Sequence, residues 1–125
     1  FKLINDQHGH EVGDQVLSGV AHRIKAQLRQ SDCLCRWGGE EFIIFMPHTD
    51  LAHACTIAEK LRLLLVAEPL LEQISVSASF GVSQWHRGQP LSGLVGCADQ
   101  MLYRAKQLGR NRVECLASVT ASPTP

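Results

Sequence analysis

The chain has 125 residues, of which 45% are hydrophobic and 19% charged, with 12 basic and 12 acidic side chains and no formal net charge. This length supports one domain with a single core, and the composition is typical of a globular protein rather than a disordered one. The neutral balance gives no indication of a nucleic-acid duplex as partner, and no apolar run approaches the ~20 residues of a membrane span.

The cysteines favour free thiols. Their number is odd and no Cys-x-x-Cys pair occurs, which argues against a disulfide framework and against a zinc site. We therefore expect reduced thiols in a cytoplasmic protein. The residues concerned are Cys33, Cys35, Cys55, Cys97 and Cys115.

Helices and strands alternate along the predicted chain. After a loop with Gly9 and Gly13, apolar residues at helical spacing predict a helix from about Asp14 to Arg29. Asp14 would lie near its start, where a carboxylate suits the helix dipole. The further predicted elements are strands over 33–37 and 42–46, a helix over 50–67, a strand over 74–82, a helix over 94–105 that Gly109 stops, and a strand over 113–116.

Between the first two strands the sequence reads Gly38-Gly39-Glu40-Glu41. Glycines supply the positive φ of tight turns, so we expect a β-hairpin here. Adjacent carboxylates suit a hard divalent ion such as Mg²⁺ or Mn²⁺, and residues without Cβ let a bulky anionic ligand approach the backbone. On these four residues alone, a solvated surface turn is the better interpretation.

Two pairs of charged residues are equally ambiguous by themselves. Lys106 and Arg110 flank a helix end, where cations are favourable in any case, although they could also grip phosphate. Arg29 and Asp32 read as a surface ion pair, although this pair could also bind the edge of a guanine.

Four blocks, in one order, resemble the GGDEF domain of the diguanylate cyclase family: FKLINDQHGHEVGDQVL, RQSDCLCRWGGEEF, SVSASFGVS and ADQMLYRAKQLGRN. The GGEEF signature with Arg-x-x-Asp five residues upstream is specific, and the resemblance runs from Phe1 to about Val113. It implies an α+β (α/β sandwich) fold like that of nucleotidyl-cyclase and polymerase palms. A central antiparallel sheet would be flanked by helices and carry the GGEEF hairpin, with residues 1–116 as the domain and 117–125 as a flexible tail.

The resemblance implies a bacterial signalling enzyme that condenses two GTP molecules into cyclic di-GMP and releases two pyrophosphates. Two domains would face each other as a homodimer, with Mg²⁺ or Mn²⁺ as cofactor and an upstream sensory domain in a cytoplasmic or membrane-attached parent. Glu40 would bind metal and act as general base, and Glu41 would assist at the metal. Gly38 and Gly39 would admit the nucleotide.

Other residues would hold the nucleotide and the product. The resemblance assigns the guanine to Asn5 and Asp14. It assigns an inhibitory site for cyclic di-GMP to Arg29 and Asp32. The phosphates would be bound by Phe1, Lys2, Lys106 and Arg110.

The chain opens at Phe1 in what reads as the middle of an element, so we expect a fragment that lacks the first strand. The family places a metal-binding Asp four residues before that position, and we therefore expect weak or no activity of the fragment alone. Three alternatives remain open: an inactive GGDEF domain that acts as a receptor for cyclic di-GMP or GTP, a structural or dimerising domain, and a related adenylyl cyclase or polymerase palm.

Overall fold

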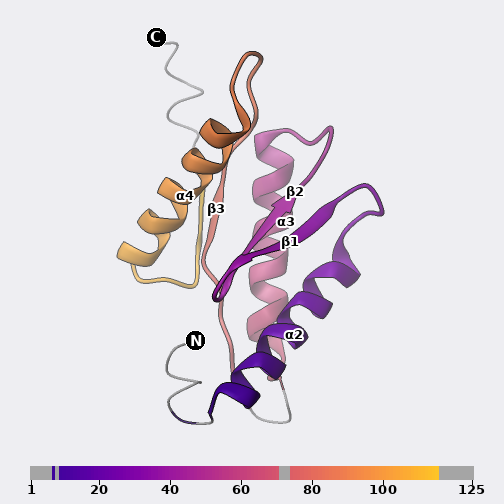
Figure 1. The fold of residues 1–125 in the computed structure, drawn as a ribbon, viewed down its shortest axis with the longest axis vertical. Helices are drawn as coiled ribbons and strands as arrows, with labels where there is room; N and C mark the ends of the chain where they lie inside the picture. The colour runs from indigo at the N-terminus through magenta and orange to yellow at the C-terminus, as the bar shows by residue number, and fades with distance from the viewer. Residues whose placement is uncertain (1–6, 8, 71–73, 116–125) are drawn as a thin grey trace. The chain divides into compact units, whose positions relative to one another are not determined.

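The computed structural model describes residues 7, 9–70 and 74–115 (Figure 1). The chain divides into two compact units, Phe1–His48 with Leu64–Val76 and Thr49–Leu63 with Ser77–Pro125, and each is described by itself. No helix of the described residues is both long and apolar enough to cross a membrane. The elements are α2 (His10–Gln27), β1 (Cys33–Gly38), β2 (Glu41–Phe45), α3 (Leu51–Ala67), β3 (Phe80–Val82), α4 (Leu91–Gln107) and β4 (Val113–Cys115).

Helix α2 of the first unit begins four residues earlier than the apolar pattern predicted. The N–H of Gly13 donates to the carbonyl of Gly9 at 3.0 Å, so the helix continues through a glycine that the pattern assigned to a loop. Glu11 is therefore the acidic residue of the first turn, and the placement of Asp14 at the helix start was wrong. The apolar face of α2 is buried through Val16, Leu17 and Ile24.

The predicted hairpin is present, with β1 and β2 antiparallel and in register from Cys33↔Phe45 to Gly38↔Glu41. The register shifts by one residue between Arg36 and Gly38, which makes a bulge beside the turn. Of the two glycines, only Gly39 has a positive φ, which is 52°. The turn chemistry that the sequence assigned to both glycines thus belongs to Gly39.

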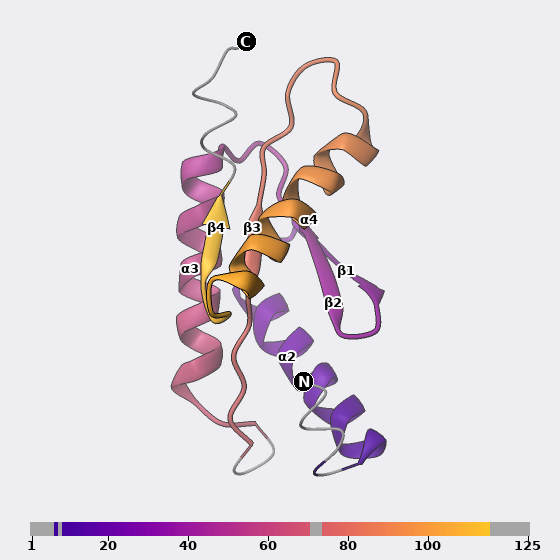
Figure 2. The same cartoon turned by 90° about the vertical axis from the view of Figure 1, so that its left-hand side faces the viewer.

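In the second unit, β3 and β4 form a parallel pair and α4 packs against both of them (Figure 2). A Cβ at Gly81 would lie 2.1 Å from the carbonyl oxygen of Ala98 and 2.3 Å from the backbone nitrogen of Leu102. Atoms that are not bonded to each other cannot lie so close, so the approach of α4 to β3 requires glycine at this position. The buried apolar residues of this unit are Ala54, Ala58, Leu61, Val82 and Ala105.

The predicted strand over 74–82 is correct only at its end. Residues 80–82 pair with β4, and Ile74 makes an isolated bridge with Leu70. The exposure alternates over residues 74–78, as the sequence pattern predicted, but residues 75–79 belong to no strand. The described strands form two separate two-stranded sheets rather than one, because alternation reports a packed face and does not supply a hydrogen-bonding partner.

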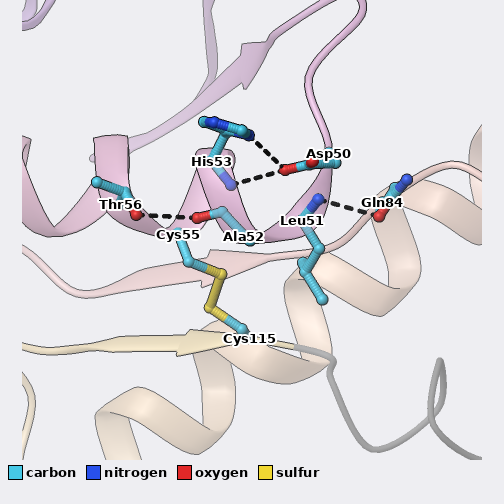
Figure 3. Close-up of a disulfide and its surroundings, with 8 residues drawn as sticks. All are labelled: Asp50, Leu51, Ala52, His53, Cys55, Thr56, Gln84 and Cys115. Carbon is cyan, nitrogen blue, oxygen red and sulfur yellow. Dashed lines mark hydrogen bonds and ion pairs between the residues drawn. A yellow bond between two sulfur atoms is a disulfide. The ribbon is translucent and has the colours of Figure 1, made fainter.

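The expectation of reduced thiols was wrong for two of the five cysteines. Cys55 of α3 and Cys115 of β4 form a disulfide, with their Cα atoms 6.6 Å apart (Figure 3). They are 60 residues apart in the sequence, so a search for closely spaced cysteine pairs cannot find them. Cys33, Cys35 and Cys97 have free thiols, as expected.

The start of α3 is held by two side chains that Figure 3 also shows. A carboxylate oxygen of Asp50 accepts the backbone N–H of His53 at 2.8 Å, which is an N-cap contact. This hydrogen bond lowers the pKa of the Asp50 carboxyl. The N–H of Leu51 donates to Oε1 of Gln84 at 3.0 Å. The helix thus starts where the sequence predicted.

Candidate functional site

The hairpin tip presents one carboxylate to solvent and a second one beside it. Gly39 and Glu40 form the turn, and Glu41 opens β2. Glu40 is exposed and Glu41 is half-buried. A Cβ at Gly38 or Gly39 would meet no atom within 4 Å, so the space beside the turn is open. The tip thus presents two carboxylates beside open space.

Arg36 holds the shape of this tip. Its Nε and Nη2 both donate to the carbonyl oxygen of Gly39, at 3.1 and 2.7 Å. The contact satisfies the turn carbonyl of Gly39 with a charge-assisted hydrogen bond. Sequence reasoning missed this role, although an arginine directly before Trp-Gly-Gly was visible in the signature.

A cavity of about 430 Å³ lies between α2 and the hairpin. Asp14 is one helical turn before Leu17, which lines the cavity, and therefore lies toward the same side of α2. Apolar and basic side chains both contribute to the lining of the cavity. The lining residues are Leu17, Ser18, Ala21, His22, Lys25, Leu34, Arg36 and Phe42.

The two predicted phosphate-binding cations belong to the second unit. Lys106 is a half-buried residue in the last turn of α4 and has an interaction partner. Arg110 lies beyond the helix in a left-handed conformation, with φ 63°. Its side chain is exposed and makes no hydrogen bond or ion pair within the described part of the chain. Arg110 is thus a cation on a backbone that non-glycine residues seldom adopt, at a cost of about 1–2 kcal/mol.

The Arg-x-x-Asp pair is formed, and the two residues bind each other. Nη2 of Arg29 lies 2.9 Å from Oδ1 of Asp32 and also 2.9 Å from the carbonyl of Pro47. The Asp32 side chain is only 2% exposed, whereas that of Arg29 is 51% exposed. Its hydrogen bonds with Arg29 lower the pKa of the Asp32 carboxyl. In this arrangement Arg29 can reach a ligand in solvent, but Asp32 would first have to turn outward.

Three predicted site residues, Phe1, Lys2 and Asn5, lie outside the described residues. Among the residues that are described, no three or more His, Cys, Asp or Glu side chains gather around a point that could hold a metal ion. The acidic tip supplies two neighbouring carboxylates, those of Glu40 and Glu41, as candidate metal ligands.

Comparison with known proteins decides the family. The family model described as "Diguanylate cyclase, GGDEF domain" matches residues 1–112. The chain belongs to the GGDEF family. It is 39% identical over 117 residues to diguanylate cyclase DgcP of Pseudomonas aeruginosa, and 42% identical over 119 residues to response regulator PleD of Caulobacter vibrioides. These matches cover 91% and 90% of this chain but only 17% and 26% of the two relatives, so the GGDEF chain spans a minor part of their length.

Solved GGDEF structures share the fold. The active GGEEF domain of a diguanylate cyclase from Vibrio cholerae has a TM-score of 0.83 at 38% identity, covering 91% of this chain and 74% of that one. Diguanylate cyclase SiaD of Pseudomonas aeruginosa, solved with its activator SiaC, has a TM-score of 0.86 at 37% identity, covering 91% and 45%. The predicted mixed α/β fold of the cyclase type is confirmed.

Proposed function

We propose that the protein containing this chain is a diguanylate cyclase that condenses two GTP molecules into cyclic di-GMP and two pyrophosphates. The observation that carries the proposal is the hairpin tip, where Glu40 stands exposed after a glycine turn in a member of the GGDEF family. Two domains would act together, each holding one GTP. The 3′-hydroxyl oxygen of each nucleotide bonds to the α-phosphorus of the other, and pyrophosphate leaves.

Glu40 is proposed as the general base that takes the proton of the attacking 3′-hydroxyl. A general base must be able to reach the hydroxyl, and the exposure of Glu40, with no partner among the described residues, leaves it free to do so. The open space at Gly38 and Gly39 would let the nucleotide approach the turn backbone. Arg36 keeps the turn in the shape that presents the carboxylate.

The donor atoms at the tip fit a magnesium or manganese ion. Both are hard cations that take oxygen ligands, and Mg²⁺ is usually bound by one or two carboxylates while water and substrate phosphate complete the shell. Glu40 and Glu41 are the residues that would hold it. When bound, the ion would neutralise charge on the phosphates.

The nucleotide would be held at both ends. Asn5 and Asp14 are proposed to bind the guanine. Phosphoryl transfer depends chiefly on positioning and on charge neutralisation, and cations serve both purposes. Lys106 and Arg110, with the backbone near Phe1 and Lys2, are proposed to bind the β- and γ-phosphates.

Arg29 and Asp32 are proposed as the inhibitory site for the product. The half-exposed guanidinium of Arg29 supports this proposal, because it can bind guanine O6 and N7 bidentately. Replacing Arg29 by Ala should relieve inhibition by cyclic di-GMP and leave the initial rate unchanged. An unchanged inhibition curve would remove the pair from regulation.

The test is turnover of the protein at its natural length with GTP and Mg²⁺, followed by chromatography for cyclic di-GMP. ATP in place of GTP separates a guanine-specific enzyme from an adenylyl cyclase. Product from GTP alone supports the proposal. Binding of GTP or cyclic di-GMP without any product would favour a receptor, and no binding of either would favour a structural domain.

A further inference from the structure

The loop that carries Arg110 holds an unusual backbone. Gly109, Arg110 and Asn111 are three consecutive residues with positive φ, of 118°, 63° and 47°. Glycine adopts such angles freely, whereas they are strained for other residues, less so for asparagine than for arginine. A conformation of this kind persists only when its surroundings determine it, and it is commonest at functional sites.

Part of the support comes from the backbone of α4. The N–H of Arg110 donates to the carbonyl of Ala105 at 2.9 Å, and the N–H of Gly109 lies 3.5 Å from the carbonyl of Lys106. These contacts close the helix end around the glycine. They fix the loop up to Arg110 but do not reach the next residue, Asn111.

Asn111 is held from two other elements of the same unit. Its backbone N–H donates to the hydroxyl of Ser79 at 3.1 Å, just before β3. Its side-chain oxygen accepts a hydrogen bond from Nη1 of Arg62, on α3, at 3.0 Å. The backbone carbonyl of Asn111 lies 3.4 Å from the same Nη1.

Arg62 is itself aligned by Glu59. Its Nε and Nη2 donate to the two carboxylate oxygens of Glu59 at 2.7 and 2.6 Å. These two nitrogens occupy one edge of the planar guanidinium, so the ion pair leaves Nη1 directed away from Glu59 and toward Asn111. The Arg62 side chain is 17% exposed, which limits its freedom to turn elsewhere.

We infer that Arg62 is a positioning residue for phosphate binding: aligned by Glu59, it locks Asn111 in the left-handed conformation and thereby fixes the direction in which Arg110 leaves the loop. The inference rests on the proposed function, because it takes Arg110 as a ligand of the β- and γ-phosphates. Arg62 itself touches no substrate. It acts by holding the loop ready before the nucleotide arrives, which removes an ordering cost from binding.

The experiment compares variants of the protein at its natural length by the KM for GTP, by kcat, and by the affinities for GTP and GMP. Arg62→Gln should raise the KM for GTP about tenfold, the loss expected for one charge-assisted contact, with kcat changed much less. The affinity for GMP should stay the same, because GMP has no β- or γ-phosphate. Arg104→Gln is the matched control, since Arg104 also pairs with a carboxylate of this unit, Glu114 at 3.3 Å.

A rescue separates positioning from general stabilisation. Asn111→Gly removes the backbone strain at that position, so the loop should form without the contact from Arg62. Adding Arg62→Gln to this variant should then change the KM for GTP less than twofold. Glu59→Gln is the milder variant in case Arg62→Gln unfolds, and should raise the KM about threefold. Thermal unfolding of each variant shows whether the fold is kept.

The outcomes distinguish the two proposals. If Arg110→Ala leaves the KM for GTP unchanged, the proposed phosphate contact fails. If Arg110→Ala raises the KM but Arg62→Gln and Glu59→Gln do not, the phosphate contact stands and the positioning role of Arg62 is overturned. An equal loss of GTP and GMP affinity, or no rescue by Asn111→Gly, would also overturn it.

Discussion

The acidic hairpin tip and the cationic loop after α4 are built in opposite ways. At the tip, Glu40 is exposed and has no partner among the described residues, and Arg36 holds the turn carbonyl of Gly39. The loop carries Arg110 on a left-handed backbone that α4, Ser79 and Arg62 all support. Both present a charged group to solvent, but the loop is held by contacts from several elements, at Arg110 by α4 and at Asn111 by Ser79 and Arg62.

The difference follows from the charges that each region has to present. Two neighbouring carboxylates repel each other less when a cation binds them, so a tip that is proposed to hold a metal ion gains little from being rigid beforehand. A cation that must meet a particular phosphate gains affinity when its direction is set beforehand. We therefore expect the function of the tip to depend on the charge of its side chains. The function of the loop should depend on the contacts that hold its backbone.

The largest effect is expected at the tip, from a change that leaves its shape intact. Glu40→Gln removes a negative charge but no contact among the described residues, so it should lower the production of cyclic di-GMP about 100-fold or more without changing the unfolding midpoint. Glu68→Gln, at another exposed glutamate of the same unit, is the control. Product formed at the normal rate would show that the assigned role of Glu40 is wrong.

The unit that carries the loop should depend on its disulfide. The bond between Cys55 and Cys115 closes a long loop of chain, and its reduction should lower the free energy of unfolding by about 2–4 kcal/mol. Denaturant unfolding with and without a reducing agent measures this. Amide exchange should increase over 109–115 and stay the same over 38–41. Cys97→Ser should leave stability nearly unchanged, because that thiol is free.

Two glycines of the same unit should respond in opposite directions to alanine. Gly81→Ala forces a methyl group into the backbone of α4 and should destabilise by about 1–3 kcal/mol or more. Gly96→Ala lies within α4, where the new Cβ meets nothing within 4 Å, and should stabilise by about 0.5–1 kcal/mol. Urea unfolding of both variants tests the packing of α4 on β3, which would be contradicted if they behaved alike.

The smallest effect concerns pH and the Arg29–Asp32 pair. Because hydrogen bonds from Arg29 lower the folded-state pKa of Asp32, this pair stabilises the fold above the ordinary aspartate pKa of about 3.9. That stability is lost as the pH falls through the lowered value. Asp32→Asn should therefore lower the unfolding midpoint by roughly a few degrees near neutral pH. The difference should be much smaller at a pH below the lowered pKa of Asp32. An equal difference at both pH values would show that the charge is not involved.

The sequence predicted the helices and the hairpin because these are local. Each helix has its own apolar spacing, and the hairpin has its own turn glycine and two flanking strands, so the bounds were correct to within a few residues. Helix α2 was started too late because Gly13 was read as a loop residue. The candidate residues at the tip and at the end of α4 were found from the signature blocks, and the family match bears out that resemblance.

The sequence by itself determined the family, the element order and the positions of the charged groups, because these are carried by residue type and short spacing. Only the tertiary structure decided the pairing of Cys55 with Cys115, the need for glycine at position 81 and the contact of Arg62 with Asn111. Each of these joins segments that are distant in the sequence. Such contacts depend on how α3, α4 and the β3–β4 pair meet, and no local pattern records that arrangement.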